Sequence, residues 1–395
     1  MEVPVRELLE LLTRWVHLIA GIMWIGNSML FNWLDRNLVK VSTREGHEGE
    51  IWLLHSGGFY QVEKKQLAPN EMPAVLHWFK WQNGVTWLSG ILLLIIVYYM
   101  GNGALMVDPA VANISPTTAI GLGLGTLVGS WAIYDGMWRS PLGQRAPEAA
   151  SAISLALLFG VAFGLTHVLS GRAAFIHVGA VMGTLMTGNV WMIIVPSQRE
   201  LVNATREGRA QDMRYAYRAK QRSIHNNYMT FPVLFIMISN HYASTYGNKL
   251  NWAVLITLMV SSALVRHFMN IRFTYQRWLP AASVSVFAGL TGLFLLTAHR
   301  VPAKVAGPPV AFADVHNVIH KRCTNCHSES PTDDIWKTAP AGVMFDSSTQ
   351  IVRMAQRIRE RAVVQKTMPL NNKTGITDEE RELLGRWVDQ GANVP

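Results

Sequence analysis

The chain is poor in cysteine and in charge. Cysteine occurs only twice in 395 residues, which excludes a structural zinc site built from four cysteines. Charged residues make up 15% of the chain and hydrophobic residues 50%, whereas soluble domains carry about 25% charged residues. Acidic residues are fewer than basic residues, and the formal net charge is +9. Because the basic excess lies in alternate loops, this composition indicates a protein of the lipid bilayer and no nucleic-acid partner.

Both cysteines lie in one motif, C-x-x-C-H, formed by Cys323, Cys326 and His327. A thioredoxin-like redox motif would need a βαβ context, which the flanking residues lack. C-x-x-C-H is the attachment signature of a c-type haem, in which both thiols add to haem vinyl groups and the adjacent imidazole binds iron. We therefore expect a covalent haem c at these three residues. Haem c is attached on the oxidising side of a bacterial membrane, so the C-terminal region is expected there.

Eight apolar stretches are long enough to cross a hydrocarbon core, which takes about 20 residues. They lie near residues 8–33, 78–100, 117–139, 149–168, 172–196, 224–244, 250–270 and 280–299. The first stretch lacks an A-x-A cleavage site and is expected to be a retained helix. The sequence thus predicts an all-α fold, in which a polytopic transmembrane bundle of about eight helices is fused to a small cytochrome c domain.

Basic residues alternate between the loops. The loop at 197–223 is rich in arginine, whereas the loop at 101–116 has neither Lys nor Arg. The positive-inside rule then places the N-terminus outside and, after eight crossings, the C-terminus outside as well. The haem motif requires the same side. We therefore expect a multi-pass protein of the bacterial inner membrane, with its N-terminus and its C-terminal domain in the periplasm.

The chain is expected to divide into three parts, which are a membrane domain at 1–299, a Pro/Gly/Ala linker at 300–311 and a cytochrome c domain at 312–395. In the last part, helices are predicted at 312–322 and 377–391. Thr377 and Glu380 fit a capping box at the start of the second helix.

Met368 is the predicted second axial ligand of the haem iron, because a thioether raises the reduction potential and suits an electron acceptor. Met344 and Met354 are the alternatives, although Met354 lies in a charged helical pattern that is typical of a surface or packing methionine. The Pro340 carbonyl is predicted to orient the His327 ring.

Polar side chains in the apolar stretches gather at two depths. Ionisable groups in a bilayer are costly and indicate functional sites, although single residues near helix ends also serve as interhelical hydrogen-bond partners. The outer group comprises His17, His167, His177, His241 and His299, and the inner group comprises His77, Lys80, Asn83, Asp135, His225, Asn226, Asn227, Arg266 and His267. Small residues follow His17 and His177, so a haem b held by this pair is a further expectation. Matches such as His17 with His177 and Asn83 with Asn227 also indicate a parallel repeat of four helices plus four.

Five segments carry a family resemblance, namely Trp15–Asn27, His177–Thr184, Asn189–Val190, His225–Phe235 and Ser239–Tyr242. With them the whole chain resembles the membrane-bound bacterial urate oxidases, or urate hydroxylases, which join a multi-helix urate oxidase domain to a C-terminal cytochrome c. The resemblance implies oxidation of urate to 5-hydroxyisourate in purine degradation. It also implies that electrons pass to haem c and then to a soluble or membrane cytochrome or a terminal oxidase of the respiratory chain.

Urate is a flat monoanion, so its recognition requires a cation and amide groups for the ring edges. We expect substrate binding by His77, Lys80, Asn83, Asn226, Asn227 and Arg266, with Asp135, His225 and His267 as catalytic residues. An outer site at His167, Asn240 and His241 is the rival placement. Two other function classes stay open. One is an electron-transfer hub between quinol or a partner dehydrogenase and a soluble cytochrome, and the other is a transporter, for which paired Gly/Pro-interrupted helices are lacking.

Overall fold

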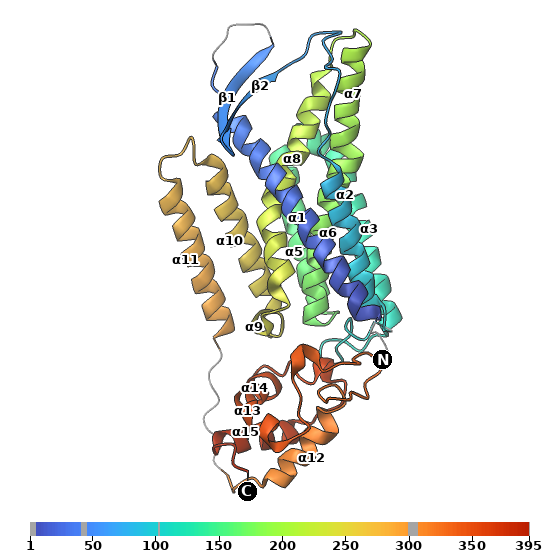
Figure 1. The fold of residues 1–395 in the computed structure, drawn as a ribbon, viewed down its shortest axis with the longest axis vertical. Helices are drawn as coiled ribbons and strands as arrows, with labels where there is room; N and C mark the ends of the chain where they lie inside the picture. Colours follow the sequence, from blue (N-terminus) through green and yellow to red (C-terminus); the bar gives the residue numbers. More distant parts are fainter. Residues whose placement is uncertain (1–4, 41–45, 102, 299–306, 395) are drawn as a thin grey trace.

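The structure is a computed structural model that describes residues 5–40, 46–101, 103–298 and 307–394. Figure 1 shows a bundle of long helices with a smaller helical domain against one of its ends. We call this the domain end of the bundle. The opposite end carries a β-hairpin and the connection between α7 (Val195–Arg206) and α8 (Met213–Ser239), and we call it the hairpin end.

Each predicted apolar stretch is helical. The long helices are α1 (Val5–Asn37), α2 (Trp81–Leu94) continued by η1 (Ile95–Tyr99), α3 (Pro116–Arg139), α5 (Pro147–Thr166), α6 (Gly171–Gly188) continued by η2 (Asn189–Ile194) and α7 (Val195–Arg206), α8 (Met213–Ser239), α10 (Asn251–Ile271) and α11 (Trp278–Thr297). Two short helices, α4 (Pro141–Arg145) and α9 (Ala243–Tyr246), lie in the connections.

Six helices of the described chain are long and apolar enough to cross a membrane, and they begin with α1, α2, α5, α6, α10 and α11. The other two predicted spans, α3 and α8, are less apolar because α3 is interrupted by glycines and α8 begins with a basic segment. Both still pack within the bundle, α3 against α6 and α8 against α6 and α10.

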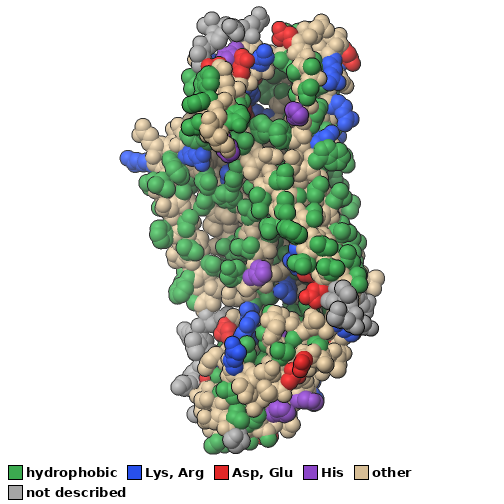
Figure 2. All heavy atoms as spheres, viewed as in Figure 1, with side chains coloured by type: hydrophobic (Ala, Val, Ile, Leu, Met, Phe, Trp, Pro, Cys, Tyr) green, Lys and Arg blue, Asp and Glu red, His purple; other side chains and the backbone are tan. Residues whose placement is uncertain are grey.

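The outer surface of the bundle is apolar. Large side chains such as Trp15 and Ile22 of α1 and Phe287 and Leu295 of α11 are exposed. Figure 2 shows hydrophobic side chains spread along the bundle, with charged side chains mainly toward its ends. Exposed apolar surface of this extent is rare on proteins in water, and it is compatible with a membrane protein.

The hairpin corrects the all-α prediction. Strands β1 (His47–His55) and β2 (Gly58–Lys65) pair antiparallel, with His55 opposite Gly58 next to the turn. Ser56 and Gly57 form the turn with positive φ angles of 50° and 80°, as a two-residue hairpin requires. Both strands lie in one loop between predicted spans. The basic residues of that loop predict its side of the membrane, but they do not predict its secondary structure.

Helix α8 corrects the predicted start of the sixth span. It begins at Met213 rather than near 224, where the Asp212 side chain accepts a hydrogen bond from the Arg214 amide. The predicted loop at 197–223 is therefore mostly helical. Apart from Arg209, which lies between α7 and α8, its basic residues belong to helices, and Arg222 is buried in the interior of the bundle.

The C-terminal domain has a core of its own, around Ile319, Leu384 and Trp387. Its elements are α12 (Phe312–Arg322), η3 (Pro340–Gly342), α13 (Ser348–Arg353), α14 (Ala355–Ile358), η4 (Arg359–Val364), η5 (Leu370–Asn372) and α15 (Asp378–Asp389). The capping box of Thr377 and Glu380 is confirmed at the start of α15. Most of the predicted linker, at 300–306, lies outside the described residues, as does His299. The repeat of four helices plus four stays a prediction.

The C-terminal domain is docked on the bundle. Asn371 Nδ2 donates to the Ala104 carbonyl at 3.0 Å, and Trp336 and Leu370 pack against the core of the bundle. Thr338 adds a longer contact to Glu7 at 3.4 Å. The two parts of the chain therefore share an interface.

Candidate functional site

Arg222 of α8 is the centre of a buried polar group nearer the hairpin end. Its side chain is 2% exposed, and its Nη2 donates to Asp135 Oδ1 of α3 at 2.9 Å. Its Nη1 donates to Asn189 Oδ1 of η2 at 3.3 Å, and its guanidinium carbon lies 4.8 Å from the Tyr134 ring centre. Asp135 also accepts from Arg139 at 2.6 Å. The charge of Arg222 is thus neutralised within the protein.

The same group extends to His225 through Tyr134 and Asn189. Asn189 Nδ2 donates to the Tyr134 hydroxyl at 3.0 Å and to Asn226 Oδ1 at 2.8 Å. The Tyr134 hydroxyl lies 2.7 Å from His225 Nδ1, and the ring centres of Trp138 and His225 are 4.3 Å apart. His225 Nε2 makes no hydrogen bond within the described chain, so this nitrogen is left for a ligand or a proton.

A second buried group joins α8 to α10. Asn227 Oδ1 accepts from Arg266 Nε at 3.1 Å and from Asn270 Nδ2 at 2.6 Å, and all three side chains are buried. Tyr228 follows Asn227 in α8, and His267 follows Arg266 in α10. The Tyr228 hydroxyl lies 2.8 Å from His267 Nδ1, and the two rings are stacked. Adjacent residues of α8 therefore serve different groups, since Asn226 bonds toward η2 and Asn227 toward α10.

The remaining members of the predicted inner group lie apart from these two. Asn83 is buried in α2, where its Nδ2 donates to Thr187 Oγ1 of α6 at 3.1 Å. The Lys80 ammonium lies over aromatic rings, 5.2 Å from that of Trp78 and 5.7 Å from that of Trp191. His77 is exposed and makes no hydrogen bond within the described chain. Helix α2 begins only at Trp81 and leaves His77 in the preceding loop, so the role of His77 in substrate binding stays a prediction.

His17 and His177 bind to separate partners. His177 is fully buried, with Nδ1 2.8 Å from the Ala173 carbonyl and Nε2 3.0 Å from the Tyr99 hydroxyl. His17 Nδ1 lies 2.9 Å from the Thr86 carbonyl of α2. Because both ring nitrogens of His177 are occupied, these contacts do not form the predicted haem b ligand pair.

Glycines beside these histidines make room for the imidazole rings themselves. A Cβ atom at Gly123 would lie 2.7 Å from His177 Nε2, and one at Gly90 would lie 3.0 Å from His17 Cε1. The two glycines thus allow the imidazole rings to pack closely, and a haem b at this pair stays a prediction.

The rival outer placement has little support from burial. His167 and His241 are both exposed, and His167 Nδ1 lies 2.7 Å from the Phe163 carbonyl of its own helix. Asn240 Nδ2 donates to the Tyr98 hydroxyl at 3.0 Å. These residues form no shared polar network comparable to the two groups around Arg222 and Arg266.

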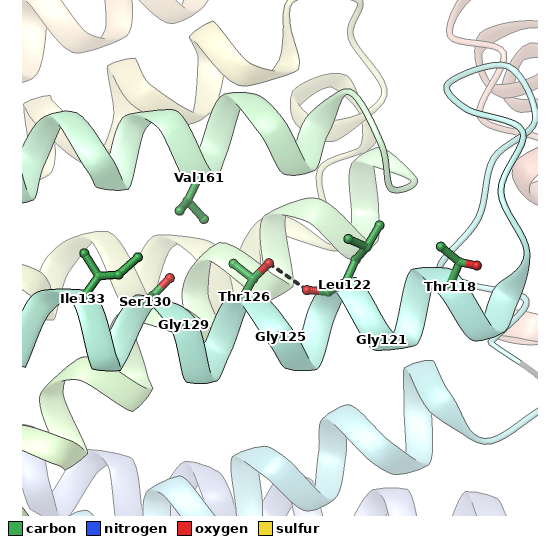
Figure 3. A pocket seen from close by; sticks show the side chains of 9 residues that line it. All are labelled: Thr118, Gly121, Leu122, Gly125, Thr126, Gly129, Ser130, Ile133 and Val161. Atoms are coloured by element: carbon green, nitrogen blue, oxygen red, sulfur yellow. Dashed lines mark hydrogen bonds between the residues drawn. The ribbon is translucent and has the colours of Figure 1, made fainter.

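A groove of about 630 Å³ runs along the outside of α3. Its lining, drawn in Figure 3, is Thr118, Gly121, Leu122, Gly125, Thr126, Gly129, Ser130, Ile133 and Val161. The groove is open and has no ionisable side chain among these residues. It therefore lacks the groups needed for proton transfer or for anion recognition.

The C-x-x-C-H residues lie at the end of α12. The His327 amide donates to the Cys323 carbonyl at 2.9 Å, so one turn brings the motif together. Burial raises the pKa of the Cys323 and Cys326 thiols to about 12, which disfavours a reactive thiolate pair. His327 Nδ1 donates to the Val343 carbonyl at 2.9 Å. The prediction that Pro340 supplies this carbonyl is wrong, since the turn at η3 brings Val343 to the ring instead.

Met368 lies in the segment that docks on the bundle. Its side chain is 36% exposed, and Leu370 and Asn371, which follow closely, make the contacts with the bundle described above. Met354, an alternative ligand, packs against the core of the C-terminal domain. The docked face of the domain thus carries Met368.

Sequence reasoning missed four members of the buried groups, which are Tyr134, Asn189, Arg222 and Asn270. A signal for two of them exists, because Arg222 precedes Asn226 and Arg266 precedes Asn270 by four residues, the spacing of one helix face. Tyr134 gave no local signal, since its partners lie on other helices, and Asn189 entered only through the resemblance, without a role. Within the described residues, no cluster of three or more His, Cys, Asp or Glu side chains could hold a metal ion.

Comparison with known proteins relates the bundle to a protein family. Residues 4–297 match the family described as urate oxidase N-terminal. No curated protein and no solved structure shows a significant match. The matched segment contains the whole bundle with both buried polar groups and stops before the C-terminal domain. It spans well over half of the sequence, and the chain therefore belongs to the urate oxidase N-terminal family.

Proposed function

We propose that this protein is a membrane-bound urate oxidase that converts urate to 5-hydroxyisourate and releases the electrons through a haem c in its C-terminal domain. The observation that carries the proposal is the family match over residues 4–297, joined in one chain to a C-x-x-C-H motif at Cys323, Cys326 and His327. The match relates the bundle to urate, and the motif supplies a route for electrons.

The reaction sets the chemical demands on the site. Urate and one water give 5-hydroxyisourate, two electrons and two protons, with the new hydroxyl oxygen taken from water. The site must therefore hold a planar anion, accept protons and pass on electrons one at a time. The two buried groups nearer the hairpin end contain the required side chains, whereas the groove along α3 does not.

His225 and His267 are the proposed proton acceptors. Each has its Nδ1 paired with a tyrosine hydroxyl, at 2.7 Å for Tyr134 and 2.8 Å for Tyr228. This pairing fixes the ring and leaves Nε2 for the substrate side. The oxygens of Asp135 contact two arginine side chains, and we propose a positioning role for it beside the predicted catalytic one. It positions Arg222 and so acts on the site indirectly.

The residues of the C-terminal motif fit a haem c. Both thiols are free and lie one turn apart, and the Val343 carbonyl fixes the His327 ring through Nδ1, which leaves Nε2 for iron. Met368 is the proposed second axial ligand. When bound, the haem supplies a one-electron acceptor.

The arrangement of the chain supports an orientation in the membrane. Eight crossings of the inner membrane, with the N-terminus and the C-terminal domain in the periplasm, agree with a domain docked at the end opposite the hairpin. A soluble or membrane cytochrome, or a terminal oxidase, would then receive the electrons on the periplasmic side.

The proposal is tested with the purified full-length protein in lipid nanodiscs. Pyridine haemochrome spectra count the haems, and urate is then added without oxygen while the haem c band is recorded. We expect urate to reduce the haem c and 5-hydroxyisourate to form. Reduction by a quinol but not by urate would refute the proposal and favour an electron-transfer hub.

Single variants test where urate is oxidised. His225→Ala and Asn227→Ala are expected to abolish urate-dependent haem reduction while leaving the haem spectrum unchanged. His167→Ala is the matched control, since this histidine is exposed at the domain end, and it is expected to keep activity. The opposite pattern would place the reaction at the outer end.

A further inference from the structure

Two buried arginines in the bundle differ in how their charge is compensated. Arg222 has the Asp135 carboxylate at 2.9 Å. Arg266 is 5% exposed and has no carboxylate within ion-pair distance in the part of the chain that the structure describes. Arg36 and Arg272 lie close enough to add positive charge around it. A buried charge without a partner is costly, so Arg266 calls for an anion that the described residues do not provide.

The amides beside Arg266 leave two hydrogen-bonding atoms unused. Arg266 Nε fixes Asn227 Oδ1 as an acceptor, and that oxygen also takes the Asn270 Nδ2 proton. The donor Asn227 Nδ2 and the acceptor Asn270 Oδ1 are buried and have no hydrogen-bond partner among the described residues. Turning over either amide would place two acceptors or two donors against each other. The Arg266 hydrogen bond therefore determines the orientation of both amides, and with it which two amide atoms are left without a partner.

We infer that Arg266, Asn227 and Asn270 form the anion subsite that recognises urate, an inference that rests on the proposed function. Urate carries one negative charge and alternates ring N–H and C=O groups along its edge. The guanidinium would pair with the charge, Asn227 Nδ2 would donate to a urate oxygen, and Asn270 Oδ1 would accept from a urate N–H. A neutral purine of similar shape would lack the charge, so this subsite also selects for the oxidised, anionic member of the purine series.

Aromatic side chains beside the subsite suit a planar ligand. The Arg266 guanidinium carbon lies 5.4 Å from the Phe231 ring centre, which keeps the guanidinium over an aromatic face. The stacked rings of Tyr228 and His267 follow directly along α8 and α10. His267 is thus the titratable group adjacent in sequence to the proposed anion partner.

The test measures urate binding without turnover. The full-length holoprotein is reduced with dithionite so that it cannot oxidise urate, and binding of labelled urate is followed by equilibrium dialysis in nanodiscs. Arg266→Gln and Asn270→Ala are expected to raise the Kd about tenfold or more, because each removes a hydrogen bond that involves a charged group or leaves its partner unpaired. Arg277→Gln is the matched control, as an exposed arginine in the connection that follows α10, and is expected to bind urate as the wild type does.

Asn270→Asp separates a ligand role from a structural one. The new carboxylate would supply the missing counter-ion to Arg266, so the variant is expected to unfold at a higher temperature and yet bind urate at least as weakly as Asn270→Ala. A merely structural group would not gain stability while losing binding. Arg266→Gln keeps the test decisive if the aspartate variant does not fold.

The outcomes distinguish the inference from the proposed function. If wild type and all three variants bind urate equally while urate reduces the haem, the inference is wrong and the proposed function stands. If chloride at millimolar concentration displaces urate from wild type and Arg266→Gln alike, the arginine holds only an ordinary counter-ion, which also refutes the inference. If wild type neither binds urate nor is reduced by it, the proposed function itself fails.

Discussion

Replacing Asp135 with asparagine is expected to destabilise the bundle far more than a surface ion pair would. The change removes the only carboxylate that pairs with Arg222 in the described chain, and the Arg222 side chain is 2% exposed. Leaving a buried charge without its partner costs about 3–5 kcal/mol. Asp135 also pairs with Arg139, but that side chain is 48% exposed, and an exposed pair contributes about 0–1 kcal/mol. Nearly all of the loss should therefore come from Arg222.

The free energy of unfolding is measured by titrating the protein from mixed micelles with sodium dodecyl sulfate, for three variants. Arg139→Gln removes the exposed partner alone and should cost about 1 kcal/mol or less. The double variant Asp135→Asn with Arg222→Gln removes both charges and should recover part of the loss, since no unpaired ion remains. Equal destabilisation by Asp135→Asn and Arg139→Gln would refute the reasoning, because it would mean that the buried charge is solvated.

Three further changes test the C-terminal domain. Asn371→Ala removes a hydrogen bond between the domain and the bundle and should slow urate-dependent haem reduction without changing the haem spectrum, and an unchanged rate in stopped-flow measurements would contradict a role in docking. Burial tends to raise the pKa of Glu380, but the Arg322 guanidinium at 2.9 Å lowers it overall, so the stabilisation is present above pH ~4.5 and is lost as the pH falls through the lowered folded value. Glu380→Gln keeps a capping acceptor and should flatten this acid dependence of the melting temperature, whereas an unaltered pH profile would show that the ion pair contributes nothing. Cys323→Ala should leave one thioether through Cys326 and move the pyridine haemochrome band to the red, and an unmoved band would show that Cys323 carries no haem.

Local properties of the chain predicted most of the helices and the capping box. An apolar run long enough to cross a bilayer is a feature of contiguous residues, and each of the eight runs is helical. Thr377 and Glu380 lie within one turn, so their mutual hydrogen bonds needed no tertiary contact. The hairpin at 47–65 escaped prediction because the charge pattern of a loop says nothing about strand pairing.

The polar residues of the site show the limit of this reasoning. The predicted depth in the membrane placed Asn226, Asn227 and Arg266 in one group. Depth does not specify the direction in which a side chain points. A rotation of about 100° per residue separates neighbours on a helix, so Asn226 bonds to η2 while Asn227 bonds to α10. His77 lies in the loop before α2, which begins at Trp81, so its distance along the chain did not specify its contacts.

The sequence by itself determined the helical bundle, the C-x-x-C-H motif and the resemblance that leads to urate. Only the tertiary structure decided that Arg222 pairs with Asp135, 87 residues away, while Arg266 shares Asn227 with Asn270 and has no carboxylate partner within the described part of the chain. The physical reason is that the length of an apolar segment and the spacing of a motif are properties of contiguous residues. Compensation of a buried charge depends instead on which helices pack together. That packing leaves Arg266 as the buried cation nearest to two unused amide atoms.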